Sequence, residues 1–458
     1  MILLYILLIL GLTKGFDFGL ATSATQVEGG WLEDNKAMTV WDNLGHTLGY
    51  VRDHTNADIA DDSYHRYHED FAIMKEYGIK HYRLSIPWTR IIPRAVAGSP
   101  VNYKAVEYYR RLLKTMKEQG LVPYVNIFHN DLPAILVING TGLSDPEFPD
   151  HFAYYANVCF ENFGDLVPYW FTFDEPWCQS VYDNLRVYDA NTKPYIMGHN
   201  ILLAHGKAVK IYREKYQSKY KGKIGLNLNI EMMWPFTDKN EDIEAARRGL
   251  IFQIDWFADP IFKGDYPSEM KSKLGGRLPR FTEEEKVMLK GSIDFFACNH
   301  YMSYLVQDGG HDENITYFDD VNTTIKYKEE WKRTDMGWPI VPEGMYYILR
   351  YIYEKWVKDH SMEIWITENG IAIHEPTLES AVNDKERINY MQTYLSYLDK
   401  ARAEGIPVTK YFSWSLLDNF EWTSGLSKKF GLVRVDYERK EKRTPKSSLL
   451  WYSQLINH

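Results

Sequence analysis

The sequence predicts an α/β fold, a single (β/α)8 TIM barrel with extended βα loops. Three observations lead to this prediction. Apolar strand-like runs alternate with helical segments, the number of these runs is eight, and no linker rich in Pro, Gly or Ser divides the chain. Eight parallel strands can close into a barrel. Barrels of this kind hold one core even in long chains, and this chain has 458 residues.

The strand-like runs are short and rich in β-branched and aromatic residues. In a parallel barrel the carboxyl ends of all strands lie on one face, and the active site is built there. The residues that follow each run are therefore the candidates for chemistry. The runs occupy residues 18–23, 80–86, 122–128, 169–173, 223–228, 293–298, 364–367 and 410–414.

Two intervening segments have the periodicity of amphipathic helices, and each stops at a glycine. The first spans residues 103–119. The second begins at Asn383, with Glu386 three residues later as a variant of the capping box. The longer intervals, roughly 235–290 and 302–362, are predicted to hold helices and extended loops that shape a pocket rim.

Two glutamates end two of the runs. Glu175 follows the fourth run and precedes Pro176, and Glu368 follows the seventh run and precedes Asn369-Gly370. A single carboxylate in such a place is usually half of a structural ion pair. Two carboxylates that end separate strands of one barrel favour acid/base or nucleophilic work on one substrate bond.

Further hydrogen-bonding and aromatic side chains occur near the ends of the other runs. Planar polar groups and flat rings are what a carbohydrate pocket needs to hold hydroxyls and to stack against a sugar. The fifth run offers Asn227 and Asn229, to which we assign no role. The candidate residues are Gln26, Arg83, His129, Asp174, Asn299, Tyr301, Trp414, Glu421 and Trp422.

The composition excludes some classes of partner. The net charge of −9 and the absence of a basic cluster in the sequence argue against nucleic acid, because phosphate binding needs grouped Lys and Arg. Aromatic residues make up 15% of the chain, which suits a ligand with flat apolar faces such as a sugar. We therefore expect a small-molecule partner with sugar-like rings and no stable membrane insertion.

Residues 1–15 are interpreted as a secretory signal peptide, because residues 2–12 form an apolar run too short to span a bilayer comfortably. Residues 16–458 then form one domain, the predicted barrel. Three glycosylation acceptors, at Asn139, Asn314 and Asn322, fit passage through the secretory pathway. The predicted location is secreted or lumenal.

We predict no metal and no cofactor. His65 and His68 lie three residues apart, but no third ligand is evident and a solvated helix face explains them better. The three cysteines, Cys159, Cys178 and Cys298, are too few and too scattered for a zinc site or a disulfide framework, and at most one disulfide can form.

Several segments, taken in order, resemble the signature segments of the family 1 glycoside hydrolases, the β-glucosidase family. The resemblance extends from residue 16 to the end of the chain, and several motifs in one register make it specific. The segments are Ala21-Thr-Ser-Ala-Thr-Gln-Val-Glu-Gly29, Tyr82-Arg-Leu-Ser-Ile86, Thr172-Phe-Asp-Glu-Pro176, Ile366-Thr-Glu-Asn-Gly370 and Trp414-Ser-Leu-Leu-Asp-Asn-Phe-Glu-Trp422.

The resemblance implies a retaining mechanism, with Glu175 as general acid/base and Glu368 as nucleophile. It implies that Arg83 and Tyr301 hold Glu368 ionised and oriented. It also implies that Gln26, His129, Glu421 and Trp422 bind sugar hydroxyls, that Trp414 forms the pocket floor, and that the Trp414-Ser415 peptide is cis. Asn299 and Asp174 are counted with the substrate-binding residues.

The chain departs from the family pattern next to the acid/base residue. The family usually has Asn there, where its side chain bonds the sugar 2-hydroxyl, and this chain has Asp174. A negative neighbour should favour the protonated form of Glu175, so we expect a changed pH profile or sugar preference. Two further departures are Asn130, where the family carries Trp, and His300, where Tyr is frequent.

Three functions follow from these residues. The first is an exo-acting retaining β-glycosidase that acts on β-glucosides or related β-glycosides. The second is a non-catalytic, klotho-like glycan-binding protein, against which the presence of both Glu175 and Glu368 speaks. The third is a transglycosidase that uses the same glycosyl-enzyme. The sequence does not determine the glycone (glucose, galactose or fucose), the aglycone or the oligomeric state.

Overall fold

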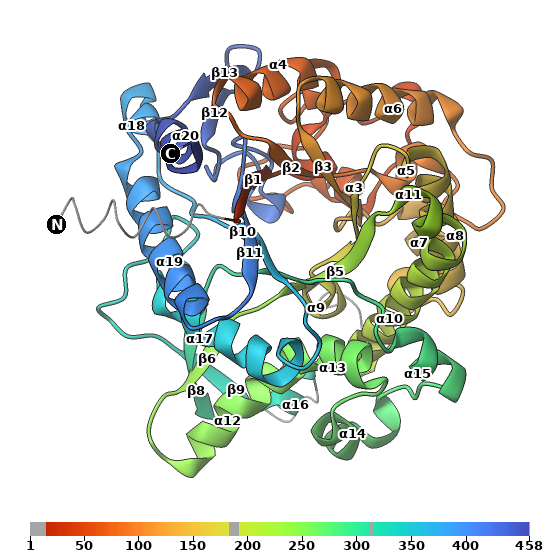
Figure 1. Cartoon of the computed structure of the whole chain (residues 1–458), viewed down its shortest axis with the longest axis vertical. Coiled ribbons are helices and arrows are strands. Elements are labelled where there is room, and N and C mark those ends of the chain that lie inside the picture. Colours follow the sequence, from red (N-terminus) through yellow and green to blue (C-terminus); the bar gives the residue numbers. More distant parts are fainter. Residues whose placement is uncertain (1–14, 183–191, 311–315, 458) are drawn as a thin grey trace.

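The computed structural model describes residues 15–182, 192–310 and 316–457. Within these residues, eight parallel strands form a closed barrel in the order β1-β11-β10-β7-β5-β4-β3-β2, and helices surround it (Figure 1). The predicted TIM barrel is confirmed. Its strands are β1 (Asp17–Ala21), β2 (His81–Ser85), β3 (Val122–Phe128), β4 (Tyr169–Asp174), β5 (Lys223–Asn229), β7 (Phe296–Asn299), β10 (Ile364–Asn369) and β11 (Val408–Trp414).

The predicted runs and the observed strands coincide to within a few residues. The strand β4 extends one residue beyond its predicted run, because Asp174 still pairs with Asn227 on β5. The first run was expected to reach residue 23, but β1 ends at Ala21 because Ser23 is the N-cap of the helix α2 (Ala24–Val27). Each carboxyl end therefore lies where the sequence placed it or close by.

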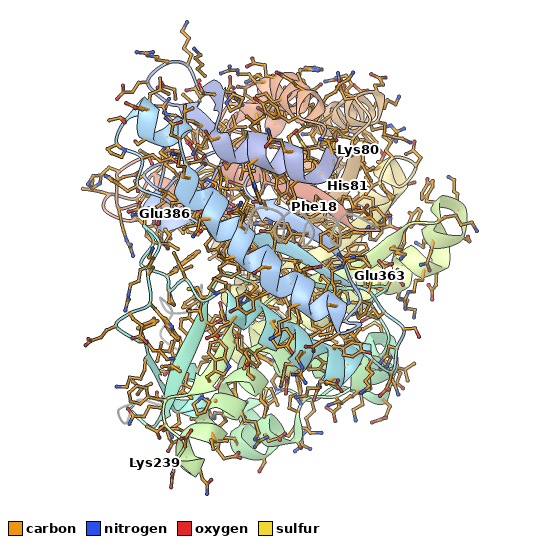
Figure 2. All side chains as sticks on the ribbon, turned by 60° about the vertical axis from the view of Figure 1, so that its left-hand side comes forward. Phe18, Lys80, His81, Lys239, Glu363 and Glu386 are labelled. Atoms are coloured by element: carbon orange, nitrogen blue, oxygen red, sulfur yellow. The ribbon has the colours of Figure 1, made fainter. Side chains whose placement is uncertain are left out.

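The two predicted amphipathic helices are present as α6 (Tyr103–Glu118) and α19 (Lys385–Ala403). The predicted capping box of the second helix is wrong. The N-cap is Asp384, and its carboxylate accepts hydrogen bonds from Arg387 and Ser448 instead of capping the helix. The Asp384 carboxylate is therefore used in tertiary contacts and does not cap α19. In Figure 2, α19 runs from Glu386 toward the end of the barrel where His81 and Glu363 lie.

The remaining helices cover the outside of the barrel and the βα loops (Figure 1). The longer ones are α4 (Ser63–Glu76), α8 (Phe148–Phe163), α10 (Lys193–Tyr212), α12 (Asn240–Leu250), α13 (Trp256–Lys263), α17 (Glu343–Ile352) and α20 (Ser447–Asn457). The shorter ones are α3 (Val40–Gly45), α5 (Trp88–Ile91), α7 (Ala134–Ile138), α9 (Pro176–Val181), α11 (Ser218–Tyr220), α14 (Ser268–Leu274), α15 (Glu283–Leu289), α16 (Tyr317–Val321) and α18 (Leu378–Val382).

The long loops carry two small sheets of their own. The first combines β6 (Met232–Pro235), β8 (Ser303–Asp308) and β9 (Thr323–Lys326), and the second is the hairpin β12 (Val433–Asp436) and β13 (Lys442–Pro445). These additions are the extended loops that the sequence predicts. In the part of the chain that is described, none of the helices combines the length and apolar character needed to cross a bilayer.

Aromatic side chains fill the interior of the barrel. Trp365 is fully buried there and stacks on Phe295 with ring centroids 3.6 Å apart, as expected for a core residue. Phe412 packs against Gly19, where a Cβ atom would lie 2.5 Å from the ring. Much of the aromatic excess in the composition therefore serves packing beneath the site rather than ligand binding.

The structure describes only some of the features linked to secretion. The predicted signal peptide, residues 1–15, is outside the described residues except for Gly15. The acceptor Asn139 is exposed, Asn322 is partly buried, and Asn314 lies outside the described residues. All three cysteines are free thiols.

Candidate active site

A cavity of about 510 Å³ opens at the carboxyl ends of the barrel strands. Most of the residues singled out in the sequence line it, although they come from distant segments of the chain. Arg83 and Asn299 contact the carboxylates from below. The lining residues among the candidates are Gln26, His129, Asp174, Glu175, Tyr301, Glu368, Trp414, Glu421 and Trp422.

Glu175 lies at the point where the chain turns from β4 into α9. Its φ angle is 46°, and Pro176 begins the helix immediately after it. The side-chain amide of Asn299 donates to Glu175 Oε1 at 3.0 Å. Burial raises the pKa of Glu175 to about 8, and the negative charge of Asp174 adds to this increase. The carboxyl group is therefore protonated near neutral pH, as a general acid must be.

Glu368 lies near the end of β10 and has two direct donors. Arg83 Nη1 donates to Oε1, and the hydroxyl of Tyr301 donates to Oε2 at 2.8 Å. Burial raises the pKa of Glu368, and the charge of Asp174 raises it further, whereas Arg83 and Tyr301 act in the opposite direction. These two donors are the contacts that stabilise the carboxylate form that a nucleophile needs.

Asp174 is surrounded by donors. Its Oδ1 accepts from Arg83, from Asn227 at 2.9 Å and from Asn299 at 3.3 Å. Burial raises the pKa of Asp174, but its neighbours His129 and Arg83, together with the two amides, outweigh burial, so that the pKa is lowered. The residue is thus a carboxylate that shares Arg83 with Glu368. Its charge raises the pKa of Glu175 in the direction that the sequence predicts.

One wall of the cavity is a stack of three rings. The ring of His129 lies nearly parallel to that of Trp414, with centroids 5.8 Å apart, and to that of Trp422, at 6.2 Å. Burial lowers the pKa of His129 to about 4, so the imidazole is neutral and keeps both a donor and an acceptor nitrogen. The Trp414-Ser415 peptide is cis, as expected.

Gln26 and Glu421 face each other at the same end of the cavity. The amide nitrogen of Gln26 donates to Phe420 O at 3.0 Å and to Asn419 Oδ1 at 3.1 Å, and lies 3.4 Å from Glu421 Oε2. Burial raises the pKa of Glu421 to about 8, with a further contribution from Glu368. This pair supplies donors and acceptors suited to vicinal hydroxyls.

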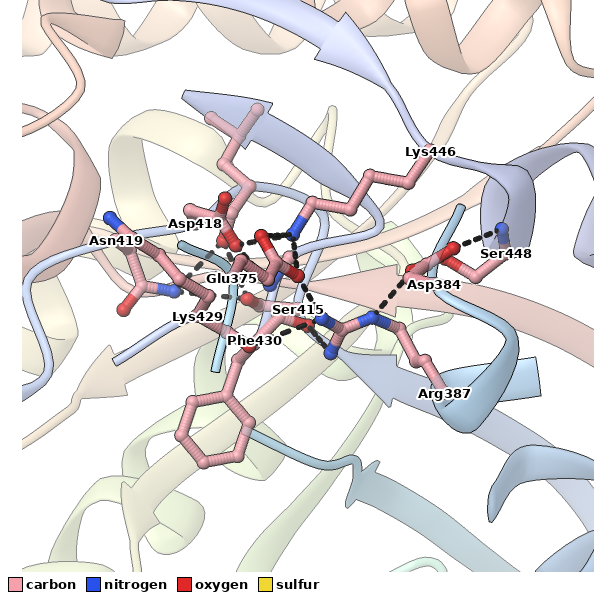
Figure 3. Close-up of polar contacts among 12 residues, drawn as sticks. Glu375, Asp384, Arg387, Ser415, Asp418, Asn419, Lys429, Phe430, Lys446 and Ser448 are labelled. Carbon is pink, nitrogen blue, oxygen red and sulfur yellow. Dashed lines mark hydrogen bonds and ion pairs between the residues drawn. The ribbon is translucent and has the colours of Figure 1, made fainter. Parts of the chain in front are cut away.

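The loops behind this pair are held by buried charges, which we call the ionic cluster: Glu375, Asp384, Arg387, Asp418 and Lys446 (Figure 3). Lys446 Nζ lies 2.7 Å from Glu375 and 2.9 Å from Asp418. Arg387 lies 2.9 Å from both Glu375 and Asp384. The cluster ties the loops after β10 and β11 to α19 and to the segment before α20.

The ionic cluster also contacts the backbone of the loops after β10 and β11. Arg387 donates to the carbonyl groups of Ile371 and Phe430, which lie on the two loops. Asn419, next to Phe420, donates to Ser415 at 3.0 Å (Figure 3). The position of Gln26 and Glu421 is therefore set by contacts that begin well outside the cavity.

The structure adds residues that the sequence analysis did not assign. Asn227 supports Asp174, and Glu231, two residues after β5, lines the cavity. The rule that strand-end residues face the site could have identified both. Trp338 also lines the cavity.

Three potential ligand atoms, one each from His129, Asp174 and Glu368, lie within 4.8 Å of one another. Arg83 donates to both carboxylates, so a cation there would compete with the guanidinium. These side chains are better suited to proton transfer and hydrogen bonding than to holding a metal ion. His65 and His68 are exposed on α4, and His65 pairs with Asp62 and Glu33.

Comparisons with known proteins agree with this geometry. The sequence profile of glycosyl hydrolase family 1 matches residues 11–458. Beta-glucosidase 40 of Arabidopsis thaliana is 39% identical over 474 residues, which cover 97% of this chain and 92% of that protein. The crystal structure of the β-glucosidase from Trichoderma harzianum has a TM-score of 0.91 and 36% identity, covering 97% of both chains. A β-glucosidase from Humicola insolens in complex with glucose has a TM-score of 0.92 and 34% identity, covering 97% of this chain and 98% of that chain.

Proposed function

Because the chain belongs to glycosyl hydrolase family 1 and is therefore a retaining glycoside hydrolase acting on β-glycosides, we propose that it releases a terminal glucosyl or related sugar from small β-glycosides. The observation that carries the proposal is the pair Glu175 and Glu368. They line one cavity with different partners: Glu175, whose pKa is raised to about 8, accepts from Asn299, whereas Glu368 accepts from Arg83 and Tyr301, which favour its carboxylate form.

In the first step, Glu368 attacks the anomeric carbon and forms a glycosyl ester while the glycosidic bond breaks. Glu175 transfers its proton to the departing oxygen, which leaves as an alcohol. Tyr301 and Arg83 keep the attacking carboxylate oriented. The hydrogen bond from Asn299 fixes Glu175 beside the bond that breaks.

In the second step, Glu175 is a carboxylate and takes a proton from water. The oxygen of this water attacks the anomeric carbon while the ester bond to Glu368 breaks. The sugar leaves with its original configuration. The charge of Asp174 supports the return of Glu175 to the protonated form.

Glucose is the proposed sugar, with galactose and fucose as the related possibilities. Gln26, Glu421 and His129 would hold its hydroxyls, and Trp414 would form the floor beneath its apolar face. The similarity to a β-glucosidase crystallised with glucose supports this choice.

A panel of nitrophenyl β-glycosides tests the proposal. We expect release of nitrophenol from the β-glucoside, the first-formed sugar to be the β-anomer by NMR, and no rate above background for Glu368→Ala. A parent rate equal to that of Glu368→Ala would contradict hydrolysis and favour the glycan-binding alternative. Adding an alcohol acceptor and analysing the products separates hydrolysis from glycosyl transfer.

We also propose that the protein enters the secretory pathway. The apolar run at residues 2–12 and the exposed acceptor Asn139 support this. Amino-terminal sequencing of the mature protein should begin near residue 16, and a deglycosylating enzyme should increase its mobility on a gel. An intact Met1 with unchanged mobility would contradict the proposal.

A further inference from the structure

Glu231 projects into the cavity from a backbone that is held on both sides. The amide of Ile230 donates to Asn299 O at 2.9 Å, and the carbonyl of Ile230 contacts His300 Nδ1 at 2.8 Å. The amide of Glu231 itself donates to Gln253 at 3.3 Å. The chain direction at this point is therefore fixed by β5, β7 and the helical segment that follows α12.

The carboxyl group of Glu231 differs from the other acids of the cavity in its partners. Asp174 and Glu368 share Arg83, and Glu421 lies 3.4 Å from the amide of Gln26. Among the residues that the structure describes, the side chain of Glu231 has neither a hydrogen-bond donor nor a counter-ion. Burial, with no compensating charge, raises the pKa of Glu231 to about 8.

Glu231 lies on the side of the cavity that receives the leaving group. Its charge acts on Glu175 and on Cys178 at the start of α9, and the neighbouring wall is made by Tyr182 and Met302. The sugar-holding residues come from the opposite loops, after β1, β3 and β11. A leaving group protonated by Glu175 would therefore extend past Glu231.

Acidic side chains outnumber lysines and arginines among the described residues that line the cavity. Five acids line it, and the one basic side chain among the described lining residues, Arg52, lies beside Thr423 on the sugar-holding side. A cation placed near Glu231 would offset the burial cost of its carboxylate and lower its pKa, whereas an anion would make that carboxylate still harder to form.

We propose that Glu231 is a specificity-determining residue that favours β-glycosides whose leaving group carries a protonated amine. This rests on the proposed hydrolysis, because it assigns the leaving-group side from the role of Glu175. The amine would donate to the Glu231 carboxylate while the glycosidic oxygen lies beside Glu175.

Three aryl β-glucosides that differ in the charge of one para substituent test the inference: aminomethyl, hydroxymethyl and carboxymethyl. The methylene group keeps the acidity of the three phenols similar. At pH 6 we expect the parent to show a kcat/KM for the aminomethyl substrate about tenfold above that for the hydroxymethyl substrate, with the carboxymethyl substrate slowest. Glu231→Gln should bring the first ratio close to one.

Glu330→Gln is the matched control, because it removes the same charge from an exposed loop that does not line the cavity. It should keep the parent ratio. A parent enzyme without a preference for the amine overturns the inference, whether or not Glu231→Gln folds. An equal fall of all three rates in Glu231→Gln also overturns it, since the residue would then act through Glu175.

Binding separates this inference from the proposed hydrolysis. Dissociation constants for the aminomethyl and hydroxymethyl substrates are measured on Glu368→Ala, with and without Glu231→Gln. Tighter binding of the amine that disappears with Glu231→Gln supports the inference even if the parent hydrolyses neither substrate. Equal dissociation constants overturn it even if the parent hydrolyses both.

Discussion

The ionic cluster and the cavity both contain buried carboxyl groups, but their partners differ. In the ionic cluster, Glu375, Asp384 and Asp418 each contact a cationic side chain at 2.7–2.9 Å. In the described part of the cavity, Glu175, Glu231 and Glu421 contact none. Arg83 serves two of the cavity acids at once, Asp174 and Glu368.

The presence or absence of a cationic partner separates the structural acids of this molecule from the functional ones. A paired buried carboxylate has a cation that offsets part of the cost of burial, and the pair fixes the loops around it. An unpaired one changes its pKa and gains from any donor or cation that a substrate brings. The two regions are linked through Phe430 and Ser415. The carbonyl of Phe430 accepts from Arg387 and from the amide of Ser415, and the Ser415 hydroxyl accepts from Asn419, which itself accepts from Gln26.

The largest effect is expected when the unpaired acid at the reaction centre is removed. Glu175→Gln should lower kcat/KM about 10³-fold for alkyl β-glucosides, whose leaving group needs a proton. For a dinitrophenyl β-glucoside the loss should be far smaller, because that phenolate leaves without protonation. Steady-state kinetics with both substrates measure this. Equal losses would show that Glu175 is not the acid.

Removing a cation from the ionic cluster should cost stability. Lys446 is fully buried, and Lys446→Met leaves Glu375 and Asp418 with fewer counter-charges. We expect the free energy of unfolding to fall by about 3–5 kcal/mol, measured by denaturant titration. Lys358→Met, which breaks an exposed pair with Glu354, is the control and should match the parent. A Lys446→Met protein as stable as the control would show that the cluster is dispensable.

Tyr301→Phe tests one of the two contacts that stabilise Glu368. It removes the 2.8 Å hydrogen bond to Oε2 and leaves Arg83 in place. We expect kcat to fall about tenfold to a hundredfold, since a hydrogen bond to a charged group is lost. Tyr347→Phe, on an exposed part of α17, should leave kcat unchanged. An unchanged kcat in Tyr301→Phe would leave Arg83 as the sole support of the nucleophile.

The smallest expected effect is a shift of the pH profile. Glu175 must be protonated to act as the acid, and its pKa is raised to about 8, so its contribution is lost as the pH rises through 8. Asp174→Asn removes a charge that raises the pKa of both Glu175 and Glu368. Both limbs of the kcat/KM profile should therefore move to lower pH, by about one unit.

Asp238→Asn, at an exposed position, is the control for the change in net charge. Its profile should follow that of the parent. Identical profiles for the parent and Asp174→Asn would remove the electrostatic role that we assign to Asp174.

The sequence by itself determined the barrel and the pair of acids. The alternation of apolar runs and amphipathic helices can be recognised within short stretches of sequence. In a closed parallel barrel, the residues that follow the strands all lie at the same face, where the active site forms. Glu175 and Glu368 could therefore be selected without coordinates. The same rule would have reached Glu231 and Asn227 at the end of β5.

Only the tertiary structure decided which charges are paired. Arg83 and Glu368 are 285 positions apart, and Lys446 and Glu375 are 71 apart, and no sequence spacing indicates such contacts. The same holds for Asp384, whose local sequence favours a helix cap and whose carboxylate instead binds Arg387 and Ser448. Pairing depends on which side chains the fold buries together, because a buried charge must find a partner in space and not along the chain.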